Sequence, residues 1–434
     1  MTKKAIGFYT ATSIVIANMI GTGVFTSLGY QVLDIKNGSS ILLLWIIGGI
    51  VSLLGALCYA EIGTTFPRSG GEYNYLSKIY HPAIGFMSGF VSSTVAFAAP
   101  VAAAALALGK YSNNVFAVDP KITASFVVIA LTMLHAFTIH IGSKFQTVFT
   151  GIKVLLIILF IGCGFFSGHT GDTGFVLNSA TLGDVSTAAF AIALFFVSYS
   201  YSGWNAASYI AGEIDEPQRN LPKSLLFGTA IVTVLYVLLN YIFLYTAPIA
   251  ELAGKDDVGF VSANFIFGDI GGKIISITIA ILLVSSVSSM IIAGPRVSQT
   301  MGSDTKLLAF LGKKSKNNTP FNATVFQCVI SLFFIFTATF SQVITYIGFT
   351  LLLFTFLTVF GLFIIRIKKM NTSDSFKTPF YPITPILFLV FNSWLLYYGI
   401  TNKPYESLIG IATVLVGLVF YYLNQIIYHQ KNEN

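Results

Sequence analysis

The chain has 434 residues, of which 55% are hydrophobic and only 9% are charged. A soluble domain carries about 25% charged residues, so this composition excludes a chain built mainly of soluble domains. It indicates a protein that crosses a membrane many times. The net charge of +7 could suggest a nucleic-acid partner, but we expect none, because the basic residues follow the membrane-topology pattern described below.

Twelve apolar segments are long enough to span a membrane, since one span needs roughly 20 residues. They cover residues 7–30, 41–65, 84–109, 122–140, 145–167, 186–212, 224–247, 272–295, 321–339, 343–366, 381–400 and 405–428. The connecting loops are short, so we expect one all-α transmembrane domain over residues 1–434. The first segment is too long for the core of a signal peptide and leads into further spans, so we expect it to be retained.

Lysine and arginine are concentrated on one side of the predicted membrane, as the positive-inside rule describes. With the N-terminus inside, most of the 24 basic residues fall on cytoplasmic loops, whereas the acidic residues divide almost evenly between the two sides. Both termini are therefore expected in the cytoplasm. Anionic membrane lipid is a secondary candidate partner of the basic loops.

The first span contains two glycines one residue apart, Gly21 and Gly23. Glycine loosens a helix, and a broken helix has free N–H groups on one side of the gap and free C=O groups on the other. In lipid these groups must line a cavity or bind a ligand. The amide end suits a carboxylate and the carbonyl end suits an ammonium, so one break can hold both charges of an amino acid. The alternative is that these small residues only let another helix pack closely.

Lys153 is the only basic residue deep within a predicted span. It lies nine residues beyond Lys144, which is roughly 13 Å into the membrane at the rise of an α-helix. Its side chain could extend back to the cytoplasmic surface. Otherwise it faces the interior of the bundle, where a buried ammonium is costly and could act as a fixed charge or a proton carrier. The eighth span offers possible partners, or simply a packing face, in Ser285, Ser286, Ser288 and Ser289.

The sixth span has a second candidate interruption, in which serines at 198, 200 and 202 precede Gly203. If the first ten spans form two five-helix repeats, residues 7–167 and 186–366, the first and sixth spans correspond. The odd number of spans inverts the second copy, and residues 381–428 add two further helices. Matched broken helices indicate a transporter site; the alternative is a serine-rich packing face. The repeat follows from the number of spans, without residue-level self-similarity.

Charged residues gather at two predicted cytoplasmic helix ends. Glu61, Arg68 and Glu72 lie around the end of the second span, and the sixth span is followed by Glu213, Asp215, Glu216, Arg219 and Lys223. Acidic residues oppose the dipole at a helix C-terminus, so we expect them to form structural or gating salt bridges with basic residues. His135 and His140 do not share a helical face, so we expect no metal ion or other cofactor. No catalytic motif is present, and we expect no enzyme.

Three stretches together resemble the amino acid–polyamine–organocation (APC) superfamily, which contains amino acid permeases with the inverted-repeat fold of the leucine transporter. They are Gly21-Thr22-Gly23-Val24-Phe25, residues 59–63 with 66–73 (YAEIG and FPRSGGEY), and residues 212–222 (GEIDEPQRNLP). Residues 201–205 (YSGWN) are similar to the L-type amino acid transporter branch and its bacterial relatives. The resemblance covers essentially the whole chain and implies broken helices 1 and 6 within a 5+5 inverted repeat, followed by two extra helices.

The resemblance also implies roles for individual residues at the two breaks. Backbone amides in the first break would bind the substrate carboxylate, and carbonyl groups from both breaks would bind its ammonium. The implied substrate-binding residues are Met19, Ile20, Gly21, Thr22, Gly23, Val24, Tyr199, Ser202, Gly203 and Asn205. Tyr199, with Trp204, would act as a gate, and Asn205 would contact the substrate or hold the unwound segment.

Lys153 matches the helix 5 lysine that, in sodium-independent members, stands near the sodium position of sodium-coupled relatives. Ser285, Ser286 and Ser289 would complete this coupling site. The resemblance favours sodium-independent exchange of small or medium neutral amino acids. Proton symport using Lys153 is the alternative mechanism, and a substrate-sensing membrane receptor is the alternative from another class.

The three cysteines, Cys58, Cys163 and Cys328, all lie in apolar segments, so no disulfide framework is expected. Animal L-type transporters pair with a glycoprotein through a cysteine in the loop after helix 3. Residues 109–121 contain no cysteine, so we expect no disulfide-linked partner. Short loops and small termini favour a bacterial plasma membrane.

Overall fold

The computed structural model describes residues 6–137, 139–168, 171, 179–315, 317–337, 340–402 and 404–430. Over these ranges the protein is helical and has no strand, and the one extended pairing is an isolated bridge between Ile6 and Ile214. The predicted all-α class is therefore confirmed.

The first predicted span consists of two helices, α1 (Phe8–Met19) and α2 (Gly23–Asp34). The other helices of the first half are α3 (Gly38–Thr65), α4 (Glu72–Ile79), α5 (Pro82–Val91), α6 (Ala98–Phe116), α7 (Pro120–Phe137), α8 (Ile139–Phe166) and α9 (Ser179–Val185). A π-helical turn, Ser92–Ala96, joins α5 to α6 and makes them one continuous crossing.

The sixth predicted span is also interrupted and consists of α10 (Ala188–Tyr201), α11 (Ala206–Tyr209) and a 3-10 turn (Ala211–Glu213). The remaining helices are α12 (Pro217–Thr246), α13 (Ile249–Leu252), α14 (Val258–Asp304), α15 (Ala309–Gly312), α16 (Phe321–Thr337), α17 (Phe340–Ile367), α18 (Ile383–Asn402) and α19 (Pro404–Gln430).

Ten helical segments in the described part of the chain are long and apolar enough to cross a membrane. Two shorter apolar helices, α10 and α16, coincide with the other two predicted spans. The helix α10 is short because it ends at the second break. The length and number of these apolar helices make the chain a multi-pass membrane protein.

The predicted eighth span, residues 272–295, lies in the part of α14 that follows a kink, and a further helical part from Val258 precedes that kink. The helix changes direction at Gly268, whose φ of +70° suits glycine. Asp269 and Lys273 form an ion pair of 3.1 Å just beyond this kink. These polar residues precede the long apolar run of the span, so the predicted start falls just beyond the kink.

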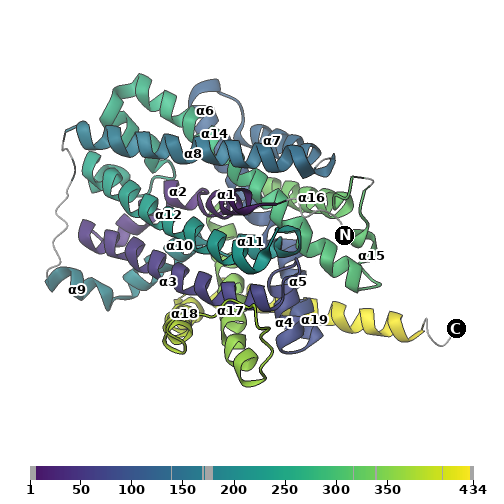
Figure 1. Cartoon of the computed structure of the whole chain (residues 1–434). Helices are drawn as coiled ribbons and strands as arrows, with labels where there is room; N and C mark the ends of the chain where they lie inside the picture. Colours follow the sequence, from purple (N-terminus) through teal and green to yellow (C-terminus); the bar gives the residue numbers. More distant parts are fainter. Residues whose placement is uncertain are drawn as a thin grey trace.

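The two halves of the first span occupy the centre of the bundle. In the most apolar stretch of α1 and α2, 89% of the residues are buried, whereas in the corresponding stretch of α19 only 28% are buried. Figure 1 shows α1 and α2 between α8 and α14 on one side and α10 and α12 on the other. Outer helices instead expose large apolar side chains, such as Phe126 on α7 and Leu408 on α19, as expected for surfaces that face lipid.

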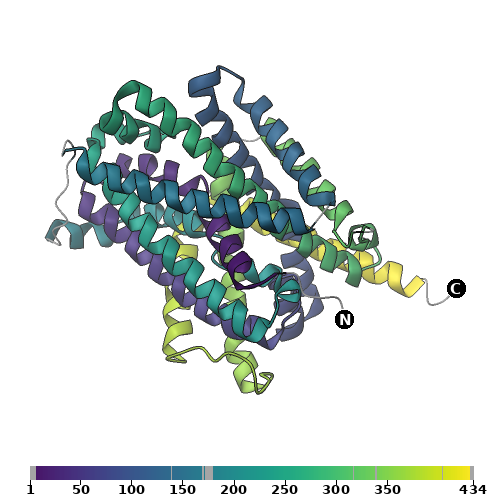
Figure 2. The same cartoon turned by 45° about the horizontal axis from the view of Figure 1, so that its top comes forward.

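Arginine residues that the sequence placed in the cytoplasm gather at one end of the bundle, here called the basic end. Arg68 pairs with Asp304 at 2.6 Å, and Arg296 pairs with Glu213 at 2.9 Å. The amide of Ile6 donates to Glu213 O at the same end. Figures 1 and 2 both show the start of α1 and the end of α19 toward this end. Glu213 thus has a basic partner as predicted, but that partner is Arg296 on a distant helix.

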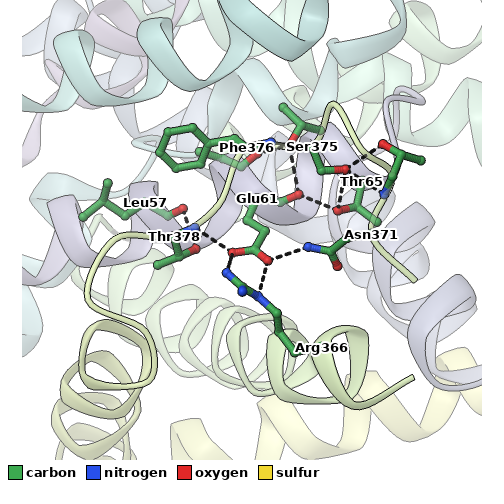
Figure 3. A network of polar contacts seen from close by, with 11 residues as sticks. Leu57, Glu61, Thr65, Arg366, Asn371, Ser375, Phe376 and Thr378 are labelled. Carbon is green, nitrogen blue, oxygen red and sulfur yellow. Dashed lines mark hydrogen bonds and ion pairs between the residues drawn. The ribbon is translucent and has the colours of Figure 1, made fainter. Parts of the chain in front are cut away.

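Glu61 on α3 is fully buried and anchors the segment that connects α17 to α18 (Figure 3). Its carboxylate accepts hydrogen bonds from Arg366 Nη2 at 2.8 Å, Asn371 Nδ2 at 2.7 Å and the Thr378 amide at 2.7 Å. The predicted salt bridge of Glu61 is confirmed, although Arg366 is 305 positions away in the chain. A buried carboxylate of this kind depends on all of its donors.

We expect Glu61→Ala to destabilise the fold by on the order of 3 kcal/mol, because it leaves the Arg366 cation without its carboxylate. The measurement is the melting temperature of the purified protein in detergent. Glu216→Ala is the matched control, since the Glu216–Arg219 pair is 3.8 Å apart and exposed, and such pairs contribute about 0–1 kcal/mol. Equal losses in the two variants would contradict a specific role for the buried carboxylate.

Candidate functional site

The first break separates α1 from α2 at residues 20–22. The ψ angle of Ile20 is 83°, outside the helical range. The last carbonyl groups of α1 and the first amides of α2, beginning at Gly23, have no partner within their own helix. The predicted interruption at the two glycines is therefore present, and it places the amides at the start of α2 next to the carbonyl groups at the end of α1.

The second break follows Tyr201, where α10 ends. Gly203 has a φ of +98° and lies against the backbone of Asn18 on α1: a Cβ on this glycine would lie 2.8 Å from the Asn18 Cβ and 2.9 Å from its carbonyl carbon. Both the backbone angle and the close approach require glycine here. The two breaks therefore meet in the centre of the bundle.

Close packing on the other side of the first break joins α2 to α10. A Cβ on Gly23 would lie 2.4 Å from Ser200 Oγ and 2.6 Å from Ser200 Cα. Ser27 Oγ and Ser200 Oγ are 2.9 Å apart and share a hydrogen bond. The alternative that a small residue only lets another helix pack closely thus applies to Gly23, which is also the first residue of α2. Gly21 differs, because a Cβ placed on it would have Met19 O as its nearest neighbour, at 3.9 Å.

Tyr236 on α12 connects the two breaks. Its hydroxyl lies within hydrogen-bond distance of Met19 O in the first break and 3.0 Å from Ser200 O in the second. A phenol has one proton, so it donates to one of these carbonyls at a time. The sequence analysis missed this residue; its only signal is a tyrosine within an apolar span.

Lys153 is fully buried and points to the first break, which excludes the extension of its side chain to the surface in this structure. Its Nζ donates to Ile20 O at 2.7 Å and to Ser286 Oγ at 2.7 Å, and Ser286 Oγ donates to the same Ile20 oxygen. The ammonium from α8 therefore sits where the carbonyl end of α1 and the serine-rich part of α14 meet.

The described structure shows no hydrogen bond between Lys153 and the other three serines of α14, and two of these serines belong to a neighbouring polar cluster. Ser285 and Ser288 hydrogen-bond to Gln146 on α8, and Ser288 Oγ is 2.8 Å from His135 Nε2 on α7. Ser289 donates to Ser286 O. The sequence analysis missed Gln146, although a buried glutamine in an apolar helix is a detectable signal.

A cavity of 70 Å³ lies beside the second break, between α3, α10, α17 and α18. Predicted residues that line it are Tyr199, Ser202, Gly203, Trp204 and Asn205. Other polar groups in its wall are Ser52, Ser198, Thr355 and Asn392. The predicted residues of the first break are not part of this wall, but Tyr199 lies beside Thr22. The cavity therefore continues away from the break toward α17.

Asn205 at the second break is held by Glu72, the first residue of α4. The Asn205 Nδ2 donates to Glu72 Oε1 at 2.7 Å, and the Tyr59 hydroxyl donates to the same oxygen at 2.7 Å. The expected basic partner of Glu72 is therefore wrong in the described structure: polar uncharged groups surround its carboxyl. Burial raises the pKa of this carboxyl, opposed by the hydrogen bonds of its neighbours.

At the end opposite the basic end, polar contacts join α2, α6 and the loop before α14 beside a cavity of 480 Å³. Asp256, just before α14, accepts from the Tyr30 hydroxyl at 2.5 Å and pairs with Lys110 of α6. Burial raises the pKa of Asp256, but its bonds with Lys110 and Tyr30 outweigh this effect and lower it overall. The Gly254 amide donates to Gly29 O at 2.8 Å, which fixes α2 against the same loop.

The arrangement can bind a small zwitterion and has no geometry for covalent chemistry. A helix N-terminus offers amides to an anion, and adjacent carbonyls offer acceptors to a cation. Over the described residues, no group of three or more metal-binding side chains gathers in one place.

The sequence matches the family model described as amino acid permease over residues 6–420. The serine/threonine exchanger SteT of Bacillus subtilis (strain 168) is 29% identical over 429 residues, which cover 97% of this chain and 96% of that protein. The b(0,+)-type amino acid transporter 1 of Mus musculus is 27% identical over 97% of this chain and 88% of its own length. The large neutral amino acids transporter small subunit 2 of Homo sapiens is 27% identical over 97% of this chain and 80% of its own length.

We expect Gly23→Ala to lower the melting temperature of the purified protein, because the added methyl group would overlap Ser200. Overpacking of this kind costs about 1–3 kcal/mol. Gly21→Ala is the matched control and should keep the wild-type melting temperature, since its methyl group meets only Met19 O at 3.9 Å. A Gly23→Ala protein as stable as the wild type would disprove the close contact between the breaks.

Proposed function

Because this chain belongs to the amino acid permease family, we propose that it exchanges small or medium neutral amino acids across a membrane without sodium. The observation that carries the proposal is the meeting of two helix breaks beside a small polar cavity at the centre of the bundle. The relative SteT supports exchange, since its name describes a serine/threonine exchanger. The family contains transporters, so the protein is not an enzyme.

The proposed architecture has twelve spans: the ten long helical segments together with α10 and α16. The first ten would form two inverted five-helix repeats, in which the broken pairs α1–α2 and α10–α11 correspond, and α18 and α19 would follow. The basic end would face the cytoplasm, together with both termini. A bacterial plasma membrane is the proposed location.

The substrate carboxylate would bind the free amides at the start of α2. The residues concerned are Thr22, Gly23 and Val24, with Gly21 providing open space beside them. A helix N-terminus carries a partial positive charge that favours an anion by about 0.3–1 kcal/mol at exposed sites. Burial away from water would increase this attraction, because the local dielectric constant is lower.

The substrate ammonium would bind carbonyl oxygens from both breaks. Met19 O already receives hydrogen bonds from the Gly21 amide and from the Tyr236 hydroxyl, so it would join the site only if Tyr236 turned to Ser200 O. Ile20 O already receives hydrogen bonds from Lys153 and Ser286, so it would join the site only if one of them moved away. We therefore assign the ammonium first to Ser202 O, and to Met19 O when Tyr236 turns away from it.

The 70 Å³ cavity would hold the substrate side chain. Its wall contains hydroxyl and amide groups but no charged residue, which suits a short neutral side chain, including one with a hydroxyl group. Tyr199 and Trp204 would close over the bound amino acid. Alternating access would then require the contacts of Asp256 at one end and Asp304 at the other to open in turn.

The absence of a cysteine in residues 109–121 leads us to propose that the protein works without a disulfide-linked partner subunit. Amino acids and membrane lipid are its proposed partners.

Purified protein in liposomes tests the exchange. We expect labelled serine or alanine to enter vesicles preloaded with neutral amino acids and not empty vesicles, with no change when sodium is added. Uptake into empty vesicles that grows with external acid would instead establish proton symport. No uptake under any condition would disprove the assignment of small neutral substrates.

A second candidate mechanism, proton-coupled symport, is favoured by the burial of Lys153 against Ile20 O and Ser286. Here the ammonium would lose and regain a proton during each cycle. The contact with the carbonyl end of α1 would transmit this change of charge to the break.

We expect Lys153→Ala to reduce transport at least tenfold, because removal of one buried hydrogen-bonded charge costs more than 1.4 kcal/mol. Under proton symport the same variant also loses its response to external pH. Lys144→Ala, an exposed lysine of the same helix, is the control and should behave as the wild type. Unchanged rate and pH response in Lys153→Ala would disprove a functional role of this lysine.

A further inference from the structure

Glu72 has an unusual position for a carboxylate. It lies between the second and third spans, yet only 3% of its surface is exposed. Its Oε1 accepts from Tyr59 and from Asn205, as described above. The titratable groups that face it in the described structure are phenols: Tyr59 on α3, Tyr75 on its own helix and Tyr209 on α11.

These contacts determine the orientation of the Asn205 side chain. An ionised carboxylate can only accept hydrogen bonds, so it must face the Nδ2 atom of Asn205 and not Oδ1. The second N–H of this amide is directed to the Tyr209 hydroxyl, 3.3 Å away. Both amide hydrogens are therefore engaged within the protein, and Oδ1 is the atom that can accept a bond from another molecule.

Asn205 also lines the polar cavity at the second break. We propose that Glu72 is a positioning residue for substrate selection: it orients Asn205 so that Oδ1 accepts a hydrogen bond from a hydroxyl on the substrate side chain. This inference rests on the proposed function, and it adds a substrate class, short neutral amino acids that carry a hydroxyl group. Glu72 does not touch the substrate itself.

A protonated Glu72 would no longer fix the orientation of the Asn205 amide. A protonated carboxyl can donate as well as accept, so the Asn205 amide could turn over and present Nδ2 to the cavity. Because burial raises the pKa of Glu72, this change sets in at a milder acidity than for an exposed glutamate. The preference for serine over alanine should therefore fall as the pH decreases.

The test compares serine and alanine as competing substrates in preloaded liposomes. In Glu72→Leu the carboxylate is lost, and we expect the KM for serine to rise about tenfold, the upper end of the effect of one hydrogen bond between neutral groups. The KM for alanine and both kcat values should change less than about twofold, since alanine has no hydroxyl group. A purely structural role would raise both KM values together and would overturn the proposal.

Glu72→Gln is the conservative variant, because its Oε1 can still accept from Asn205 and Tyr59. We expect a KM for serine between those of the wild type and Glu72→Leu, and a serine preference that no longer depends on pH. Glu251→Gln, at an exposed glutamate, is the control and should keep the wild-type pH profile. A Glu72→Gln protein that retains the wild-type pH profile would also overturn the proposal.

The same experiment separates the two levels of inference. If the wild type exchanges neither serine nor alanine, the proposed function fails and the role of Glu72 falls with it. If the wild type exchanges both but Glu72→Leu shows an unchanged ratio of KM values, only the role of Glu72 is wrong.

Discussion

The structure depends on one constraint: backbone N–H and C=O groups released inside a membrane have no water to satisfy them. The two helix breaks release such groups where Gly203 packs against Asn18, and the surrounding helices supply partners for several of them. Lys153 and Ser286 bind Ile20 O, and Tyr236 reaches both Met19 O and Ser200 O. Each partner comes from a different helix, so the breaks hold the bundle together as well as forming its site.

The same constraint explains why the buried polar residues form separate clusters and are not scattered. Glu61 at the basic end is surrounded by Arg366, Asn371 and Thr378, which fix a loop on α3. Glu72 lies nearby in the sequence but has phenol and amide neighbours and contacts the second break. Two buried carboxylates of one short segment therefore have different uses, one structural and one linked to the site, because their donors differ in charge.

Sequence analysis located the helices well, since long apolar segments and glycine interruptions are local signals. It also identified Lys153, because a charge within an apolar segment stands out. It could not find the partners of Glu61, Glu72 or Glu213, which lie on distant helices and depend on how the bundle packs. Tyr236 and Gln146 were missed for the same reason: their function follows from the carbonyl or hydroxyl groups opposite them. The predicted start of the eighth span, residue 272, lies close to the kink of α14 at Gly268.

The shared hydroxyl of Tyr236 has a thermodynamic consequence for the empty protein. One proton serves two carbonyl acceptors, so whichever one it binds, the other loses this donor, and Met19 O then keeps only the Gly21 amide. The unliganded centre is therefore frustrated. An arriving cationic group resolves this frustration without any strain in the helices, since it completes a set of hydrogen bonds that the protein alone leaves short. The loaded centre is then better satisfied than the vacant one. In an exchanger, such an imbalance favours the substrate-bound carrier over the empty one.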